Sequence, residues 1–355
     1  MGILENILIM KATHWVAFFI ESMQRIRVIG GGLAGSIFAM QALESGYTVE
    51  WWTWGRPSSS LVAAGISNPL ALKRLKFIQR AEDFMNSSRA FYHWLESETG
   101  RSFYQTLPLY HILYTDGEIN DWEVKAESPL GEKYLGRISR NAELNRILGE
   151  LNNVGWLDTE VFLEVTQEMK SPSLNLIERC WNISDLNDEI ETVLCQGWKS
   201  DTLPFGIEPK AFNPAKGEVI IIFSESFPIR DGILHGGVFV LPLGNHLYKI
   251  GSTYTWDDLN ELPSATGLEF LIEEFEKLWK GEYHLISHLA AVRPTTRDRK
   301  PLVGRVPNYK NLSVFNGMGS RAVLMAPLLS LELLAHLFEG SELPPEVSPL
   351  RFLAK

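Results

Sequence analysis

A glycine-rich turn near the start of the chain constrains the fold more than any other feature. Residues 25–29 (RIRVI) predict a short strand, and Gly30, Gly32 and Gly35 follow it with the spacing G-x-G-x-x-G. Apolar residues then recur at helical intervals over residues 33–45, which predicts a helix directly after the turn. Strand, turn and helix in this order are typical of a Rossmann-like α/β fold.

The residues of this turn are suited to holding a pyrophosphate. The first glycine permits the tight turn, the second lets a phosphate approach the backbone, and the third lets the helix pack on the strand. Leu33 and Ala34 open the helix, so their N–H groups and the positive end of the helix dipole would face the anion. Gly46 and a second strand over residues 48–52 complete the unit, which favours dinucleotide binding over an ordinary glycine turn.

The residue that ends the second strand departs from the usual dinucleotide-binding pattern. The second strand of such a unit ordinarily ends in Asp or Glu, whose carboxylate holds a pair of ribose hydroxyls. Thr53 occupies that position, and Glu50 lies earlier in the strand. We expect Thr53 to hydrogen-bond the ribose less strongly than a carboxylate does. The departure concerns the ribose contact and leaves the pyrophosphate site unchanged.

Composition bounds the class of protein. The chain has 355 residues, 45% of them hydrophobic and 21% charged, with a formal net charge of -10. This length predicts two domains or one large one, and excludes a disordered chain, a small disulfide scaffold and a collagen-like repeat. The acidic balance argues against an extended nucleic-acid surface. Cys180 and Cys195 show no metal-ligand spacing and make no disulfide framework, so we expect a reducing compartment.

Residues 1–24 are expected to form a peripheral extension. Lys11, Thr13 and His14 interrupt its apolar stretch, no basic region precedes that stretch, and no small-residue cleavage site follows it. The stretch is therefore neither a signal peptide nor a membrane span. No other segment reads as apolar enough to cross a bilayer, so we expect a soluble, cytoplasmic protein that does not bind membranes.

Two further segments are suited to a nucleotide-binding sheet. The run SSSLVAAGI is small and rich in hydroxyl groups, so Ser59, Ser60 and Gly65 can approach a diphosphate or a flavin edge without steric bulk. A flexible surface loop is the alternative for this run. The run ETVLCQGW predicts a strand that enters a turn at Gly197. In two-domain flavoproteins such a strand returns the chain to the nucleotide-binding sheet.

The C-terminal third reverses the charge of the chain. Seven basic residues and one acid, Asp298, lie in the segment 293–321 of a chain that is acidic overall. An anionic cofactor together with an anionic substrate would explain the inversion, and a solvated loop is the alternative. The seven basic residues are Arg293, Arg297, Arg299, Lys300, Arg305, Lys310 and Arg321.

A second glycine turn lies in the run GMGSRAVLMAP. Gly319, Ser320, Arg321 and Ala322 lead from this turn towards a helix expected over residues 328–338. A helix start at this place can direct its positive end at the flavin N1 and C2 carbonyl and stabilise the charge that arises on reduction. These four residues are therefore candidates for the cofactor site.

Taken together, these motifs resemble the D-amino-acid oxidase superfamily of FAD-dependent oxidoreductases. The resemblance covers residues 25–340 with gaps, in the runs GGGLAG, SSSLVAAG, VLCQGW, FVLPLG…YKIGSTY, RPTTRDRKPLVG and GMGSRAVLMAP. The last two runs are most similar to the oxidase domain of the bifunctional enzymes that finish 5-methylaminomethyluridine in tRNA, with glycine and sarcosine oxidases next. The resemblance implies FAD as cofactor and oxidation of the C–N bond of a small amine or amino acid by hydride transfer to flavin N5.

The resemblance also implies roles for single residues. The family's carboxylate-binding arginine falls on Arg293, Tyr254 matches a strand end that faces the substrate, and Phe239 is expected as an apolar lid over the flavin. A structural arginine beside Pro294 and a packed tyrosine are the alternatives. No residue is assigned as general base. Both cysteines precede residue 196 and no histidine flanks SSSLVAAG, so we expect FAD to be bound non-covalently, and we expect no metal site.

The family fold is discontinuous, which predicts two domains built from separate segments. A Rossmann-like FAD-binding domain takes residues 25–80, 146–205 and 291–355, and an antiparallel-sheet substrate domain takes residues 81–145 and 206–290. The ligand is expected where the two domains meet. The sequence leaves the oligomeric state open.

Two other functions stay open on the sequence alone. Oxidation of a wobble-uridine side chain in tRNA is consistent with the GSR turn and the basic run, while the acidic net charge opposes it. A flavin-binding module without catalysis is the other alternative, with Thr53 as its one hint.

Overall fold

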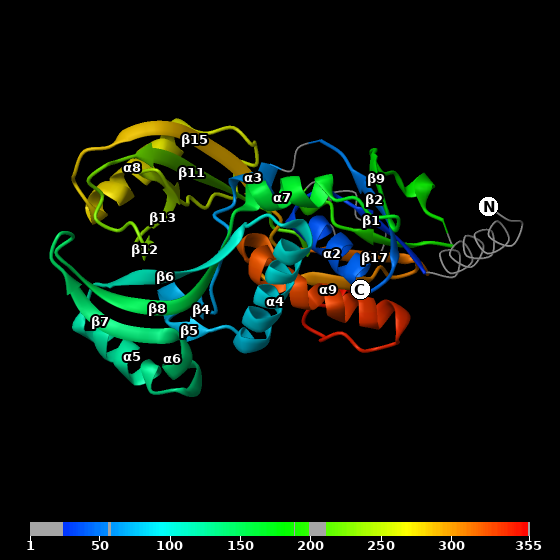
Figure 1. The fold of residues 1–355 in the computed structure, drawn as a ribbon, viewed down its shortest axis with the longest axis horizontal. Helices are drawn as coiled ribbons and strands as arrows, with labels where there is room; N and C mark the ends of the chain where they lie inside the picture. The colour runs from blue at the N-terminus through cyan, green and yellow to red at the C-terminus, as the bar shows by residue number, and fades with distance from the viewer. Residues whose placement is uncertain (1–23, 56–57, 188, 199–210, 354–355) are drawn as a thin grey trace, which may run out of the picture.

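Two β-sheets lie at opposite ends of the molecule, with helices between and around them. The computed structural model describes residues 24–55, 58–187, 189–198 and 211–353. Its helices are α2 (Leu33–Glu44), α3 (Ser58–Val62), α4 (Ala81–Thr99), α5 (Asp116–Ala126), α6 (Pro129–Tyr134), α7 (Thr159–Glu168), α8 (Ala265–Leu278) and α9 (Ala322–Phe338). Figure 1 shows α2 and α9 beside the smaller sheet, and α3, α4 and α7 in the middle of the molecule. The predicted extension, residues 1–24, lies almost wholly outside the described residues.

The smaller sheet is the predicted Rossmann-like sheet. Its six strands run in the order β16-β17-β10-β1-β2-β9, and all neighbours are parallel except β16 and β17. These strands are β1 (Arg25–Ile29), β2 (Thr48–Thr53), β9 (Leu174–Glu178), β10 (Glu191–Leu194), β16 (Leu302–Arg305) and β17 (Leu312–Asn316). The run ETVLCQGW forms β10 beside β1, which confirms its predicted return to this sheet.

The larger sheet has nine strands and is mostly antiparallel. Its main path runs in the order β15-β11-β14-β13-β12-β6-β8-β3, and β7 pairs with β8. The strands are β3 (Ile66–Ser67), β6 (Tyr104–Leu113), β7 (Leu135–Asn141), β8 (Arg146–Leu157), β11 (Ala215–Phe223), β12 (Ile233–His235), β13 (Phe239–Gly244), β14 (Leu247–Gly251) and β15 (His284–Arg293). A separate two-stranded pair joins β4 (Leu70–Ala71) to β5 (Lys76–Phe77).

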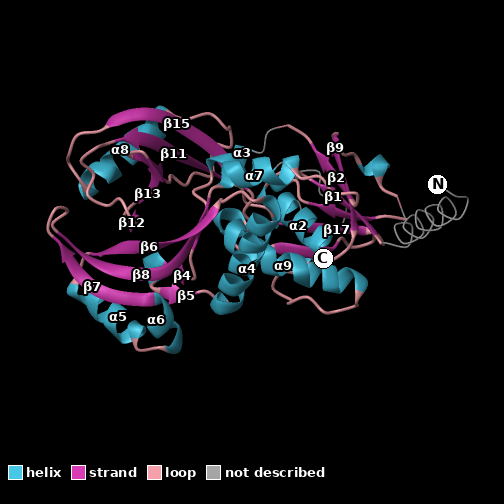
Figure 2. Cartoon of the chain, viewed as in Figure 1, coloured by secondary structure: helices cyan, strands magenta, loops and turns pink. Residues whose placement is uncertain are grey.

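The larger sheet consists of two halves joined by one short parallel pair. Strands β6 and β12 share only the register from Ile233 opposite Leu109 to His235 opposite His111. The half with β11, β13, β14 and β15 is covered by α8, and the half with β7 and β8 by α5 and α6 (Figure 2). The contact between β6 and β12 therefore decides whether the two halves form one continuous sheet.

The sheet assignment corrects one predicted domain boundary. The chain was expected to return to the FAD-binding domain at residue 146, but Arg146–Leu157 form β8 at the centre of the larger sheet. The return comes only after β8, at α7 and then β9. Antiparallel pairing of β8 with both β6 and β7 buries its apolar side chains, and this long-range pairing has no signature in the local sequence. The other boundaries stay predictions.

The helix α9 is longer and more enclosed than the sequence predicts. It begins at Ala322, six residues before the predicted start at residue 328, although it contains Pro327. Proline has no N–H for the carbonyl four residues earlier, and the Tyr92 hydroxyl donates to that Val323 carbonyl instead, at 2.8 Å. A side chain of α4 thereby allows the helix to continue through the proline.

The enclosure of α9 also explains its composition. The stretch Gly319–Phe338 is long and apolar enough to cross a membrane by length and composition, so the expectation that no segment reaches this threshold is wrong. The helix packs against α2 on one side and α4 on the other, and residues such as Val323, Leu329 and Leu333 are fully or almost fully buried. A helix that is buried on several sides is apolar all round.

Candidate functional site

The glycine turns meet at the carboxyl edge of the smaller sheet. Strands β1, β10 and β17 are neighbours and end at the same edge, each followed by one of the predicted turns. The Asn316 amide donates to the Gly197 carbonyl at 2.9 Å, which joins the turn after β10 to the turn after β17. Ligands of open parallel sheets bind outside this edge.

Steric crowding explains the glycines of the first turn. Gly30 has φ of 126°, and a Cβ there would lie 2.4 Å from the Cys195 carbonyl oxygen. A Cβ at Gly35 would lie 2.0 Å from the Gly30 carbonyl oxygen. Both positions therefore require glycine, as the dinucleotide-binding pattern predicts. The Leu33 N–H donates to the Ser60 hydroxyl at 3.0 Å, so the SSSLVAAG run lies at this turn as well.

Two helices begin at N-cap residues whose own side chains would not compete with an anion, although in α2 the Leu33 N–H already donates to the Ser60 hydroxyl. The side chains of Thr115, Ser128, Asp158 and Ser264 cap α5, α6, α7 and α8. In contrast, α2 and α9 have no side-chain cap at their N-cap residues, and neither has an acid in its first turn. Exposed N–H groups and the helix dipole make both helix starts suitable for negative charge. This arrangement fits a pyrophosphate at α2 and the pyrimidine end of a flavin at α9.

The segment 58–66 is not the flexible surface loop that was the alternative interpretation above. Ser58–Val62 form the short helix α3, which packs against β15. Gly65 has φ of 74°, and a Cβ there would lie 2.0 Å from the Leu157 carbonyl oxygen. Gly65 is therefore required by its contact with β8, whatever further role it has towards a cofactor.

Thr53 lies beside the first glycine turn, where the ribose-binding acid is ordinarily found. A Cβ added at Gly31 would lie 3.1 Å from the Thr53 Cγ2. Glu50 does not substitute for the missing acid, because its carboxylate accepts from Arg27 Nε at 2.7 Å and from Trp52 Nε1 at 2.5 Å. The ribose contact predicted for Thr53 therefore stays a prediction.

Arg293 lies at the end of β15 and is bound from several sides. Its Nη1 donates to the Lys216 carbonyl at 3.3 Å, and its Nη2 donates to the Ser252 hydroxyl at 2.8 Å. Both nitrogens also donate to the Thr253 carbonyl at 3.3 Å. A Cβ at Gly217 would lie 2.0 Å from Nη2, so the guanidinium rests on a glycine of β11.

The other two predicted catalytic residues adjoin Arg293. The guanidinium carbon lies 4.9 Å from the centre of the Tyr254 ring, a cation–π geometry. Phe239 lies opposite Gly251 in register, and a Cβ on Gly251 would come within 2.9 Å of its ring. Because Gly251 directly precedes Ser252, the structure brings Phe239, Tyr254 and Arg293 together at one end of the larger sheet.

The two C-terminal motifs also lie side by side. The Gly319 N–H donates to the Pro294 carbonyl at 3.2 Å, and Thr295 forms a bridge with Met318. The turn that carries Ser320, Arg321 and Ala322 therefore lies directly beside the end of β15. Arg293 belongs to the larger sheet and α9 to the smaller one, so the candidate site spans both sheets.

Three half-buried cations at this site have no ion-pair partner among the described residues. Burial lowers the pKa of Lys249, Arg293 and Arg321, and none of them has an Asp or Glu within ion-pair distance there. By contrast, the buried Arg27 and Lys216 are paired, with Glu50 at 2.7 Å and with Asp258 at 2.8 Å. Buried charges are normally compensated, so these three side chains mark a place that is suited to an anion.

Lys249 was not among the residues predicted from the sequence. This residue sits in the middle of β14, and its Nζ donates to the Ala63 carbonyl at 3.1 Å, next to α3. Its neighbours Tyr248 and Ile250 are buried in the core with α8, so Lys249 points to the opposite face of the sheet. A lysine between two apolar strand residues was the available signal, because alternate residues of a strand face opposite sides.

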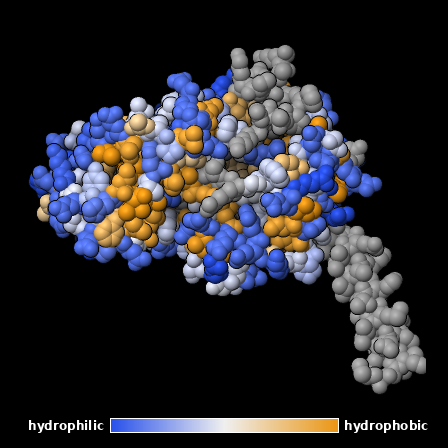
Figure 3. Space-filling view, turned by 90° about the horizontal axis from the view of Figure 1, so that it is seen from above, coloured by the Kyte–Doolittle hydropathy of each residue, from blue (hydrophilic) through white to orange (hydrophobic). Residues whose placement is uncertain are grey.

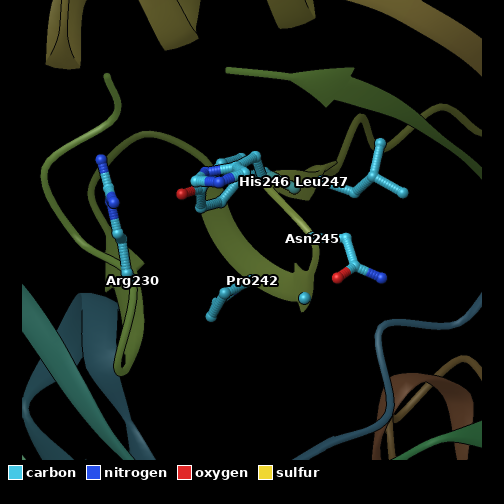
Figure 4. Close-up of a pocket in the computed structure, with 7 residues that line it drawn as sticks. Arg230, Pro242, Asn245, His246 and Leu247 are labelled. Carbon is cyan, nitrogen blue, oxygen red and sulfur yellow. The ribbon is translucent and has the colours of Figure 1, made fainter. Parts of the chain in front are cut away.

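One cavity of about 370 Å³ lies away from these residues. It is lined by the turn between β13 and β14, including Asn245 and His246, and by Arg230 (Figure 4). That turn is at the opposite end of β14 from Gly251 and Arg293. The cavity therefore takes no part in the candidate site.

Comparison with known proteins agrees with this geometry. Residues 170–337 match the DAO family model, described as FAD dependent oxidoreductase. Glycine oxidase from Bacillus licheniformis is 26% identical over 139 residues, which cover 39% of this chain and 37% of that protein. The tRNA 5-methylaminomethyl-2-thiouridine biosynthesis bifunctional protein of Acinetobacter baylyi is 24% identical over 94% of this chain and 57% of that protein. These alignments therefore span only part of the length of each relative.

Solved structures share the fold over nearly the whole chain. Iminodiacetate oxidase from Chelativorans sp. BNC1 superposes with a TM-score of 0.76 at 16% identity, covering 92% of this chain and 99% of that one. Glycine oxidase from Geobacillus kaustophilus superposes with a TM-score of 0.75 at 20% identity, covering 94% and 100%.

The fold and the matched family model define an FAD-dependent oxidoreductase domain of mixed α/β architecture. The chain is similar to the D-amino-acid oxidase superfamily of FAD-dependent oxidoreductases, whose family model matches residues 170–337. The crowded glycines at the first turn and the two uncapped helix starts fit that cofactor.

Proposed function

We propose that the protein oxidises the C–N bond of a small amine that carries a carboxylate, either glycine or an N-substituted glycine. The observation that carries this proposal is Arg293, a largely buried guanidinium with carbonyl and hydroxyl neighbours but no carboxylate partner among the described residues. A substrate carboxylate supplies the missing negative charge, and its charge-assisted hydrogen bonds contribute roughly 1.5–3 kcal/mol.

The names of the relatives support this substrate class. Glycine oxidases recur among the sequence and structure matches, and iminodiacetate, the substrate named for one of the solved structures, is an N-carboxymethyl glycine. Each of these compounds has an amine one carbon away from a carboxylate. A single arginine at the end of β15 can therefore orient all of them in the same way.

The side chains of the site have distinct tasks in this proposal. Arg293 holds the carboxylate, and the Tyr254 ring covers one face of the guanidinium and keeps it in place. Phe239 excludes water from the reacting carbon. Bound FAD would supply the acceptor for the hydride that leaves the substrate carbon, and water would hydrolyse the resulting iminium product. Lys249 and Arg321 add positive charge around the cofactor, which favours its reduced, anionic form.

The proposal includes non-covalent binding of FAD. Cys195 is buried between the glycines of the first turn, and burial raises the pKa of its thiol, which keeps it protonated and unreactive. Cys180 is exposed at the end of β9, in the smaller sheet. Release of free FAD on denaturation, followed by filtration and absorbance of the filtrate, tests this part directly.

Anaerobic titration of the FAD-loaded protein tests the substrate class. We expect glycine, sarcosine or iminodiacetate to bleach the flavin band, and methylamine, which lacks the carboxylate, to bleach it at least tenfold less efficiently. Arg293→Met should lower kcat/KM for the carboxylated amine by roughly 10- to 150-fold, the equivalent of about 1.5–3 kcal/mol, while the Kd for FAD stays unchanged.

A conservative variant distinguishes charge from geometry in the same experiment. Arg293→Lys keeps the positive charge but cannot form two parallel hydrogen bonds, so it should recover only part of the lost activity. Bleaching by methylamine and glycine with equal efficiency would contradict the carboxylate assignment.

A tRNA substrate is the second candidate. The alignment with the tRNA-modifying relative covers 94% of this chain, and Arg299 and Lys300 are exposed next to the candidate site. The net charge of -10 opposes a large nucleic-acid surface. Gel-shift titration with tRNA at low and moderate salt decides between the two, because phosphate contacts lose affinity steeply as the salt concentration rises.

A further inference from the structure

A cluster of polar side chains, two of them buried and two nearer the surface, lies behind Arg293, on the other face of β11. Lys216 is 1% exposed, and its Nζ donates to Asp258 Oδ2 at 2.8 Å and to Asn260 Oδ1 at 2.9 Å. Glu218 is 3% exposed, and its Oε1 lies 3.7 Å from the same Nζ. We name Lys216, Glu218, Asp258 and Asn260 the rear cluster. The charges of Lys216 and Glu218 need no ligand, because each is compensated by another member of the cluster.

The rear cluster fixes the segment that connects β14 to α8. Asp258 and Asn260 lie in the middle of this segment, residues 252–264, and both bind Lys216. Glu218 holds the end of the segment, because its carboxylate accepts from the Ser264 N–H at 2.9 Å and from the Ser264 hydroxyl at 2.7 Å. Ser264 is the N-cap of α8, so this end is joined to the helix.

The same segment forms one side of the Arg293 site. Thr253 offers its carbonyl to both terminal nitrogens of Arg293, and the Tyr254 ring covers the guanidinium. Thr255 and Lys216 exchange two backbone hydrogen bonds, at 2.8 and 3.0 Å. The Lys216 carbonyl also accepts from Arg293 at 3.3 Å. One residue, Lys216, therefore bonds Arg293 through its backbone and the opposite part of the segment through its side chain.

The exposed side chains of the segment contribute little to its placement. Tyr254 and Trp256 are 42% and 45% exposed, and their ring centres lie 4.8 Å apart at the surface. Leu262, further along, is 71% exposed. Apolar surface gathers in separate patches on the face shown in Figure 3, and no apolar layer covers the molecule there. The segment is held instead by polar contacts to β11, both through the backbone hydrogen bonds of Thr253 and Thr255 and through the side chains of Lys216 and Glu218.

We propose that Lys216, Asp258 and Asn260 are positioning residues for carboxylate recognition. They hold the segment 252–264 so that the Thr253 carbonyl and the Tyr254 ring keep the Arg293 guanidinium in one orientation. This inference rests on the proposed function of Arg293. Without the rear cluster the guanidinium keeps its charge but loses its fixed direction, so affinity for a carboxylate falls while the cofactor site is unchanged.

The test uses the exposed side of the cluster, where substitutions are compatible with folding. The Asp258 side chain is 43% exposed, so the double variant Asp258→Ala/Asn260→Ala removes both partners of Lys216 at the surface. Asp258→Asn keeps an oxygen acceptor for the ammonium. As a matched control, Glu82→Gln weakens the exposed ion pair with Lys133, in which Glu82 is 51% exposed, far from the site.

Acetate serves as the probe, and its Kd is read from the perturbation of the flavin absorbance in the FAD-loaded proteins. We expect the double variant to bind acetate about tenfold more weakly, Asp258→Asn to recover most of the affinity, and Glu82→Gln to match the wild type. With glycine as substrate, KM should rise while kcat changes less than twofold. The Kd for FAD and the Tm should stay close to the wild-type values.

The outcomes separate this inference from the proposed function. A wild-type protein whose flavin responds neither to acetate nor to a carboxylated amine overturns both. If the wild type responds and the double variant binds acetate equally well, only the positioning role is overturned. Loss of FAD affinity or a large drop in Tm in the double variant assigns the cluster to stability alone, and likewise overturns the positioning role.

Discussion

The partners of the buried and half-buried cations in this protein indicate which cations are structural and which are suited to a ligand. Arg27, Arg305 and Lys216 are buried or half-buried and have acidic partners. Among the described residues, Lys249 and Arg293 donate hydrogen bonds to carbonyl and hydroxyl oxygens and to no carboxylate. A carbonyl orients a cation but leaves its net charge uncompensated. Lys249 and Arg293 are therefore expected to lower the stability of the ligand-free fold.

The destabilisation caused by the Lys249 charge can be measured from the pH dependence of the free energy of unfolding. Burial lowers the pKa of Lys249 in the folded protein, whereas the unfolded chain keeps a value near 10.4. Below that pH the unfolded state binds the proton more tightly, so stability rises as the pH rises towards it. We expect the free energy of unfolding of wild-type protein, relative to Lys249→Met, to increase between pH 7 and pH 10. Urea unfolding of the FAD-free proteins at both pH values provides the measurement.

An exposed lysine provides the control for this prediction. Lys73 is exposed in the short turn after β4, and Lys73→Met should leave the difference from wild type constant over the same pH range. If the free energies of unfolding of wild type and Lys249→Met changed equally with pH, the Lys249 ammonium would be fully solvated in the folded protein.

The residues of the site could be predicted from the sequence only in part. Arg293, Tyr254 and Phe239 were found through motifs, and the structure brings them together. Lys216 and Gly217 were missed, because their importance arises from the pairing of β11 with β15 and with the segment after β14. No local pattern reports which strand lies next to another. From the sequence alone, a lysine followed by a glycine is typical of an exposed turn. Only the pairing of β11 with its neighbours shows that Lys216 is buried.

At the scale of elements, α9 shows how one contact can offset a helix-breaking residue. Pro327 leaves the Val323 carbonyl without its helical partner, and the Tyr92 hydroxyl of α4 supplies the missing donor at 2.8 Å. Sequence rules place a helix boundary near a proline, so they predicted a start at residue 328 rather than 322. The true start could not be predicted, because its stabilising partner lies 231 residues away in the chain.

This compensation predicts a coupling between the two residues. Tyr92→Phe removes the donor and leaves a buried carbonyl unpaired, so it should lower the free energy of unfolding by about 1–3 kcal/mol. In a Pro327→Ala background the alanine supplies a backbone N–H that can bond that carbonyl, and the same Tyr92→Phe change should cost clearly less. Urea unfolding of the four proteins in this double-mutant cycle gives the coupling energy. Equal costs in both backgrounds would mean that Tyr92 acts only through packing.

At the scale of the whole molecule, the larger sheet depends on the short β6–β12 pair. His111 and His235 face each other across this pair, with 3.1 Å between their Nδ1 atoms. Burial lowers the pKa of His235 to about 3, helped by His111, and burial also lowers the pKa of His111, against the effect of Glu118. Trp122 of α5 stacks on His111. Both imidazoles are therefore neutral in the folded protein at neutral pH.

The histidine pair predicts a loss of stability in acid. The unfolded chain takes up protons on both histidines near pH 6.5, while the folded chain resists them down to much lower pH. Stability should therefore fall as the pH drops below about 6.5, and His235→Asn should make the decrease in Tm between pH 7.5 and pH 5 smaller. The exposed His284 provides a control, since His284→Asn should show the wild-type decrease. An unchanged pH dependence in His235→Asn would rule out this contribution.

The overall architecture was more predictable than its division along the chain. The strand, turn and helix at residues 25–44 are local features, and the structure has them within a residue of the prediction. The position of β8 is a property of the whole sheet, since it depends on β6 and β7 on either side. A boundary inferred at residue 146 therefore divided a strand from its own sheet.

The strand order of the smaller sheet has a consequence for biosynthesis. Strands β16 and β17 and the start of α9 come from residues 302–322, yet they complete a sheet that β1 and β2 begin. A ribosome must therefore deliver the residues from β1 through the start of α9 before the pocket for the cofactor can close. Until then the edge of β10 is unpaired, and a nascent chain needs protection from aggregation at that edge.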